Sequence, residues 1–156
     1  MKRLIDHKLN AWENRSRRKP LIVRGARQVG KTHSIRAFGQ REFANTAVFD
    51  FEMDRRLHLI FAEDLRAEKV LMQLEAAAGM RIHPGETLLF FDEIQACPRA
   101  LMALRYLYEQ VPELHVVAAG SLLEFALEDI SFPVGRAEFE WMRPMCFAEF
   151  LMALGE

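Results

Sequence analysis

The sequence predicts an α/β fold in which a mostly parallel sheet carries helices on both faces, a three-layer sandwich. Short apolar segments alternate along the chain with segments of helical periodicity, and the segment 88–91 is apolar without interruption. Alternating strands and helices favour a parallel sheet, and such apolar strands fit burial on both sides. A length of 156 residues with 51% hydrophobic content suits one globular domain.

The first half of the chain yields four helical segments and two strands. Apolar side chains recur at near-helical spacing from residue 2 to 14, and the basic segment 15–20 ends that helix, so residues 1–19 form a helical, basic lead-in. A strand at 21–23 stops at Gly25 and is followed by helix-compatible residues 31–40. We then expect a strand at 46–51 and helices at 57–65 and 67–78.

The second half repeats the alternation. A Pro84-Gly85 turn precedes a buried strand at 87–91, and Pro98 begins a helix that Pro112 ends. A strand at 115–119 leads into a short helix after Gly120. Alternation predicts a strand at 137–141, and a helix is expected at 147–154.

Cysteine content and hydropathy exclude several classes of protein. Cys97 and Cys146 lie far apart, and the five histidines lack metal-ligand spacing, so neither a disulfide framework nor a zinc site is indicated. No apolar run exceeds five residues, whereas a membrane-spanning helix needs roughly 18 or more. We expect a cytoplasmic protein.

The formal net charge of −1 hides an asymmetry. Residues 1–45 hold 12 Lys and Arg against 3 Asp and Glu, and residues 46–156 hold 9 against 19. A basic first part can meet nucleic acid, nucleotide phosphates, or the acidic remainder of the same protein.

The most specific motif is a phosphate-binding loop between a predicted strand and a predicted helix. It reads Gly25-Ala26-Arg27-Gln28-Val29-Gly30-Lys31-Thr32, a complete G-x-x-x-x-G-K-[ST] pattern. Glycines let the backbone wrap phosphate closely, and the helix amino end adds a positive dipole. We expect Lys31 to reach the β- and γ-phosphates and Thr32 to bind Mg²⁺, and we count His33 with these nucleotide-binding positions.

A second motif places two carboxylates at the end of a buried strand. In the segment 88–93, Asp92 and Glu93 follow four apolar residues, and ligands of open α/β sheets bind at such carboxyl ends. We expect Asp92 to hold Mg²⁺ and Glu93 to orient and deprotonate the attacking water.

Two further residues have alternative interpretations. Ser121 follows a strand and is either a sensor of the γ-phosphate or a helix N-cap with Glu124 as its partner. Arg136 either neutralises charge on the transferred phosphate, in cis or from a neighbouring subunit, or pairs at the surface with Glu138 or Glu140.

Other aromatic and apolar residues have simpler interpretations. Trp12 and the basic run 15–19 either border the adenine or form a packed helix and a solvated loop. We expect the segment 145–152 to belong to the core.

With these residues in view, the chain resembles the N-terminal ATPase domain of a prokaryotic family of AAA+-like P-loop ATPases. The segments 25–32, 91–95, 119–121, 133–136 and 143–150 carry the likeness. The resemblance implies the sheet order 5-1-4-3-2, with the sensor strand between the strands that end at Gly25 and Asp92. Family members are more than twice as long, so it also implies that residues 1–156 are the N-terminal part of a longer protein.

These observations predict Mg²⁺-dependent ATP binding and hydrolysis coupled to an unidentified partner or substrate, with homo-oligomers or a protein partner possible. One alternative is a nucleotide switch without catalysis. Others are a small-molecule kinase, which Glu93 disfavours because kinases must keep water from ATP, and a nucleic-acid-binding module that uses the basic first part.

Overall fold

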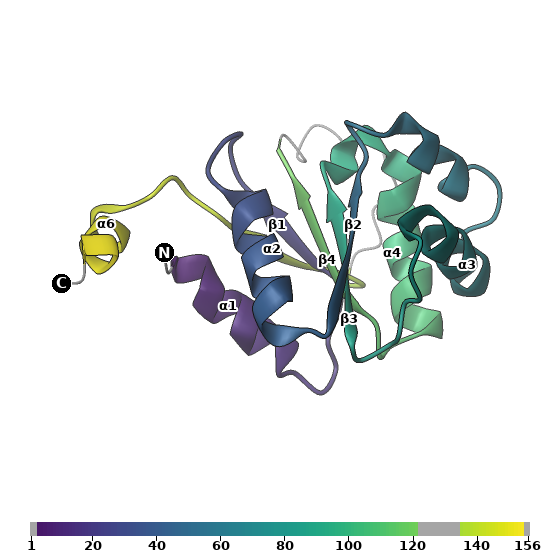
Figure 1. Cartoon of the computed structure of the whole chain (residues 1–156), viewed down its shortest axis with the longest axis horizontal. Coiled ribbons are helices and arrows are strands. Elements are labelled where there is room, and N and C mark those ends of the chain that lie inside the picture. Colours follow the sequence, from purple (N-terminus) through teal and green to yellow (C-terminus); the bar gives the residue numbers. More distant parts are fainter. Residues whose placement is uncertain (1–2, 122–134, 155–156) are drawn as a thin grey trace.

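The computed structural model describes residues 3–121 and 135–154 of the chain. Within these residues five parallel strands form one sheet in the order β2-β3-β4-β1-β5 (Figure 1). The strands are β1 (Leu21–Arg24), β2 (Asn45–Asp50), β3 (Thr87–Asp92), β4 (His115–Gly120) and β5 (Glu138–Trp141). The expected order 5-1-4-3-2 is therefore confirmed.

Helices cover both faces of the sheet (Figure 1). α1 (Leu4–Glu13) and α2 (Lys31–Glu42) lie on one face, and α3 (Ala67–Ala78) and α4 (Pro98–Gln110) lie on the other with the 3₁₀ helix η1 (Arg55–Phe61). A single 3₁₀ turn, η2 (Ile94–Ala96), follows β3. The final helix α6 (Phe147–Leu154) lies apart from the sheet, near the start of α1.

The alternation of side chains along the strands divides the core into two clusters. In β3, Leu88 and Phe90 pack toward α1 and α2, whereas Leu89 and Phe91 pack toward α3 and α4. All four are fully buried, which is the pattern of a parallel strand covered on both faces.

Local signals account for several helix ends. Pro98 stands in the first turn of α4, where its missing N–H costs nothing. Gly79 ends α3 with a left-handed backbone, φ 64°. The Asp6 carboxylate accepts from the Arg3 N–H and so satisfies a donor at the start of α1.

Two expectations from the sequence are wrong. The helix expected at 57–65 is the 3₁₀ helix η1, which Asp54 caps by accepting from the Arg56 N–H and which ends at Phe61. The segment 145–152 is not core: Met145, Phe147 and Phe150 are 44%, 74% and 48% exposed. Its apolar periodicity requires a covering surface, and the described residues bury little of it.

The short helix expected after Gly120 falls on residues outside the described ranges. Within the described ranges, no helix combines the length and the apolar content that crossing a bilayer demands.

Candidate functional site

The loop at residues 25–30, here called the glycine loop, joins the carboxyl end of β1 to the amino end of α2. Gln28 and Gly30 have positive φ of 63° and 95°, so the backbone turns through left-handed positions before the helix starts. Gly25 lies against the segment after β5, because a Cβ added there would be 2.1 Å from the Met142 carbonyl oxygen. This glycine is required by close packing within the chain.

Lys31 is the first residue of α2, and its side chain turns back into the glycine loop. The residue is only 5% exposed, and Nζ donates to the carbonyls of Gly25 and Ala26 at 2.9 and 2.7 Å. The ammonium is therefore held at the loop centre, where the motif predicts contact with phosphate.

Asp92 lies at the end of β3 and is 3% exposed. The Thr32 side chain hydrogen-bonds its carboxylate, and the Glu93 N–H donates to Oδ1 at 3.1 Å. The structure thus brings together the two residues that the sequence predicts as Mg²⁺ ligands, although they come from different elements.

Glu93 has φ 47° and ψ 46°, a left-handed conformation that costs a non-glycine residue about 1–2 kcal/mol. Its Oε2 accepts from Gln95 Nε2 at 2.6 Å and from Ser121 Oγ at 3.4 Å. Ser121 follows β4, the strand next to β3, and is 1% exposed. The strained backbone and these two donors fix the carboxylate beside the end of β4.

Burial and neighbouring charges shift the pKa values of the two innermost groups. Burial lowers the pKa of Lys31, against the opposing charges of Glu93 and Asp92. Burial also raises the pKa of Asp92, the Thr32 hydrogen bond opposes this shift, and the Glu93 charge adds to it. A cation beside Asp92 would relieve its desolvation, and hydroxyl and carboxylate oxygens are ligands that Mg²⁺ prefers.

The other predicted site residues divide into two groups. Ala26, Arg27, Gln28 and His33 are exposed on the glycine loop and the first turn of α2, and Val29 is half-buried. Arg136 is not brought to this edge of the sheet: it precedes β5, whose Glu138 is level with the start of β1.

The partner expected for Arg136 is wrong as well. Its Nε donates to Glu109 of α4 at 2.7 Å, whereas Glu138 and Glu140 pair with Arg15 and Lys8. A role for Arg136 in a neighbouring subunit stays a prediction. The N-cap interpretation of Ser121 depends on Glu124, which lies outside the described residues.

The basic lead-in packs against the domain. Trp12 is 1% exposed, its Nε1 donates to the Lys19 carbonyl at 2.7 Å, and the Arg18 guanidinium lies 5.6 Å from the centre of its ring. Trp12 is thus a packed core residue, and with the pairs of Arg15 and Lys8 the lead-in is partly neutralised by this chain's own acidic residues.

Two contacts of the site have no signal in the sequence. Gln95, in the segment that follows Glu93, carries no predicted role, yet its amide binds the Glu93 carboxylate. Arg3 donates from Nη1 to the Val29 carbonyl of the glycine loop at 3.1 Å, 26 positions away. A motif search over local spacing does not find such a contact.

Comparisons with known proteins agree with this geometry. A model of the AAA domain family matches residues 17–151. A solved structure of Drosophila ORC bound to DNA contains a chain of similar fold, with a TM-score of 0.61 and 17% identity. The match covers 96% of this chain and 44% of that one, so this chain spans less than half the length of its structural relative.

No curated protein matches the sequence. At 17% identity the likeness to the ORC chain shows the fold alone, which is the α/β fold of P-loop nucleotide triphosphatases. The family model, however, covers most of the chain, and the sheet order and the glycine loop agree with it. This chain therefore belongs to the AAA domain family, with its nucleotide-binding AAA+ ATPase fold.

Proposed function

We propose that this chain binds ATP with Mg²⁺ at the glycine loop and hydrolyses the bond between the β- and γ-phosphates. The observation that carries the proposal is the convergence of three charged side chains at one edge of the sheet, Lys31 from the start of α2 and Asp92 and Glu93 from the end of β3. A buried lysine flanked by two carboxylates and a glycine loop is suited to a highly charged phosphate chain.

Each residue has a distinct role in this proposal. The N–H groups of residues 25–33 and the Lys31 ammonium bind the phosphates, with Lys31 exchanging its bonds to the Gly25 and Ala26 carbonyls for phosphate oxygens. Thr32 and Asp92 hold Mg²⁺, which when bound neutralises charge on the phosphate oxygens.

The Glu93 carboxylate is the general base. It accepts a proton from water while the water oxygen bonds to the γ-phosphorus and the bond from phosphorus to the bridging oxygen breaks, so that ADP and phosphate leave. The hydroxyl of Ser121, already within 3.4 Å of Glu93, orients this carboxylate and senses the γ-phosphate.

The ion pairs of the lead-in argue against nucleic acid binding as the primary function. Lys8 and Arg15 are paired with Glu140 and Glu138, so part of the basic first segment is already neutralised. The DNA bound in the ORC structure belongs to that assembly. We propose that the partner that uses the energy of ATP binds at a surface other than the basic lead-in. We also propose that the protein acts in the cytoplasm.

Titration calorimetry with Mg-ADP and Mg-ATP tests nucleotide binding. Lys31→Ala should abolish micromolar binding, while Lys69→Ala, which removes a lysine of α3 paired with Asp64, should leave it unchanged. A folded wild-type protein that binds neither nucleotide would contradict the proposal.

Phosphate release without an added acceptor tests hydrolysis and separates it from kinase activity. Glu93→Gln should reduce turnover by about 10²–10⁴-fold while nucleotide affinity is kept. Wild-type turnover is expected to be slow if an arginine must come from a neighbouring subunit, since that group contributes about 10³–10⁵ in rate. Turnover equal to that of Glu93→Gln would favour the switch without catalysis.

A further inference from the structure

Arg3 and Glu149 form an ion pair although 146 positions separate them in the sequence. Arg3 Nε donates to Glu149 Oε1 at 2.9 Å, and Nη2 lies 3.4 Å from Oε2. The two side chains are 10% and 6% exposed. Removing such an ion pair from water is costly. The remaining N–H groups of the guanidinium and the carboxylate oxygens therefore need further hydrogen-bond partners.

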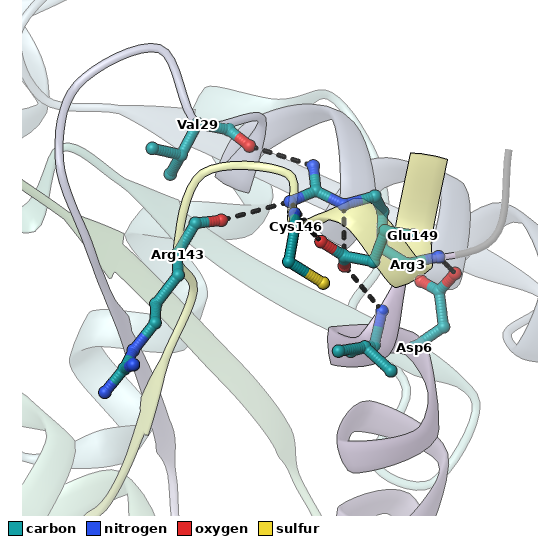
Figure 2. A network of polar contacts seen from close by, with 7 residues as sticks. Arg3, Asp6, Val29, Arg143, Cys146 and Glu149 are labelled. Carbon is teal, nitrogen blue, oxygen red and sulfur yellow. Dashed lines mark hydrogen bonds and ion pairs between the residues drawn. The ribbon is translucent and has the colours of Figure 1, made fainter. Parts of the chain in front are cut away.

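Those further bonds lead to the glycine loop. Figure 2 shows the Arg3 guanidinium lying between the Glu149 carboxylate and two backbone carbonyls. Nη1 donates to the Val29 carbonyl at 3.1 Å, and Nη2 donates to the Arg143 carbonyl at 3.0 Å. One side chain therefore ties the start of α1, the glycine loop and the segment before α6 together.

Glu149 completes the set of contacts, here called the clasp. Its Oε1 also accepts from the Leu4 N–H at 2.9 Å, and Oε2 accepts from the Cys146 N–H at 3.0 Å. The hydrogen bond from Arg3, with those two N–H groups, lowers the pKa of Glu149 to about 2. The carboxylate is thus charged at neutral pH and bound on both oxygens.

Among the described residues, Glu149 of the clasp hydrogen-bonds α6 to the start of α1. None of the α6 side chains that the structure describes belongs to either core cluster, and Phe147 and Phe150 are largely exposed. α6 is therefore held near the start of α1 by charge and hydrogen bonding, and the same guanidinium that binds Glu149 also binds the glycine loop.

We propose that Arg3 and Glu149 are positioning residues, which hold the glycine loop in its nucleotide-binding conformation and couple nucleotide affinity to the docking of α6. The inference rests on the proposed function of the glycine loop. Arg3 acts through the Val29 carbonyl, one residue before Gly30, whose left-handed backbone begins the turn into α2. Because coupling between two sites is reciprocal, bound nucleotide must in turn strengthen the docking of α6.

The test compares three variants with the wild-type chain. Arg3→Ala removes the clasp, and Glu149→Gln keeps its shape without the charge. Lys8→Ala is the matched control, because it removes another ion pair between α1 and the C-terminal part of the chain, to Glu140, without contacting the glycine loop. Affinity for Mg-ADP is measured by calorimetry, and backbone hydrogen exchange by mass spectrometry with and without Mg-ADP.

Loss of the clasp should weaken Mg-ADP binding by about 10- to 100-fold, the range for losing a hydrogen bond to a charged group. Exchange of the amides at 28–34 should become faster even without nucleotide, and the protection that Mg-ADP confers at residues 4 and 146–150 should disappear. Lys8→Ala should behave as the wild type.

The outcomes separate the inference from the proposed function. Wild-type binding that depends on Lys31 but is unaffected by Arg3→Ala and Glu149→Gln would overturn the inference and leave the proposed function standing. If the wild-type chain binds no nucleotide, the proposed function fails. Hydrogen exchange of the amides at 28–34 then still tests the positioning role, because equal exchange rates in Arg3→Ala and Lys8→Ala would overturn it. If Arg3→Ala does not fold, Glu149→Gln provides the same comparison.

Discussion

The substitution Gly25→Ala tests the close approach between the glycine loop and the segment after β5. A methyl group on Gly25 would lie 2.1 Å from the Met142 carbonyl oxygen and 3.2 Å from its carbonyl carbon. Ordinary non-bonded contact needs about 3.5 Å, so the two backbones would have to separate by about 1 Å or more.

Met142 is not free to move away. Its N–H donates to the Arg24 carbonyl at 2.7 Å, and its side chain is buried in the cluster beneath α1 and α2. Overpacking of this kind costs about 1–3 kcal/mol, and the loss of the hydrogen bond costs about 1 kcal/mol. We expect Gly25→Ala to lower the free energy of unfolding by about 2–4 kcal/mol.

Nucleotide affinity should fall as well, because a site tolerates displacements of only about 0.5 Å. We expect Mg-ADP to bind at least about 10-fold more weakly, as measured by calorimetry beside urea denaturation. The matched control is Gly79→Ala at the end of α3, with φ 64° and nothing within 4 Å of an added Cβ. It should lose about 1–2 kcal/mol of stability from its left-handed backbone and keep its affinity. A Gly25→Ala protein with wild-type stability and affinity would refute the reasoning.

Three further predictions concern the core and the titrating side chains. Phe91→Ala should destabilise the chain by about 3–5 kcal/mol in urea denaturation, because its ring packs edge-on against three other buried phenylalanines; a loss below about 1 kcal/mol would contradict this packing. Burial, with the Arg18 charge, lowers the pKa of His115 to about 4. Unfolding therefore takes up a proton between pH 6.5 and 4, so stability should fall as pH drops through this range by up to about 1.4 kcal/mol per unit, and His115→Gln should flatten that slope. A thiol reagent should modify exposed Cys146 in the native protein and buried Cys97, whose pKa is raised by burial, only after unfolding; rapid native modification of both would argue against the described packing.

The sequence alone predicts much of the fold and the centre of the candidate site. The glycine loop and the carboxylates of Asp92 and Glu93 are local patterns, each tied to the end of one apolar strand. Parallel strands bring their carboxyl ends to one edge, so these patterns meet without any knowledge of long-range contacts. The sheet order came from family resemblance and not from periodicity.

Apolar periodicity predicts less where the sequence does not indicate which part of the protein packs against the apolar side of a helix. The apolar spacing of 147–154 predicts a helix, and α6 is one, but spacing does not say which surface meets its apolar side. The segment 57–65 has helix-compatible residues, yet Asp54 caps a short 3₁₀ helix there instead. In both segments the tertiary environment overrides a pattern that is only locally defined.

The tertiary structure alone decided which charged side chains find each other. Arg136 pairs with Glu109 and not with its sequence neighbours, and Arg3 crosses to Glu149 and the Val29 carbonyl. Many arginines and carboxylates in a chain are chemically equivalent partners, and spacing along the sequence distinguishes them only within one helix or strand. Packing makes the choice among distant partners. It brings Arg136 and Glu109 together at the surface, and it brings Arg3 and Glu149 together away from water, where an unpaired charge is too costly to leave.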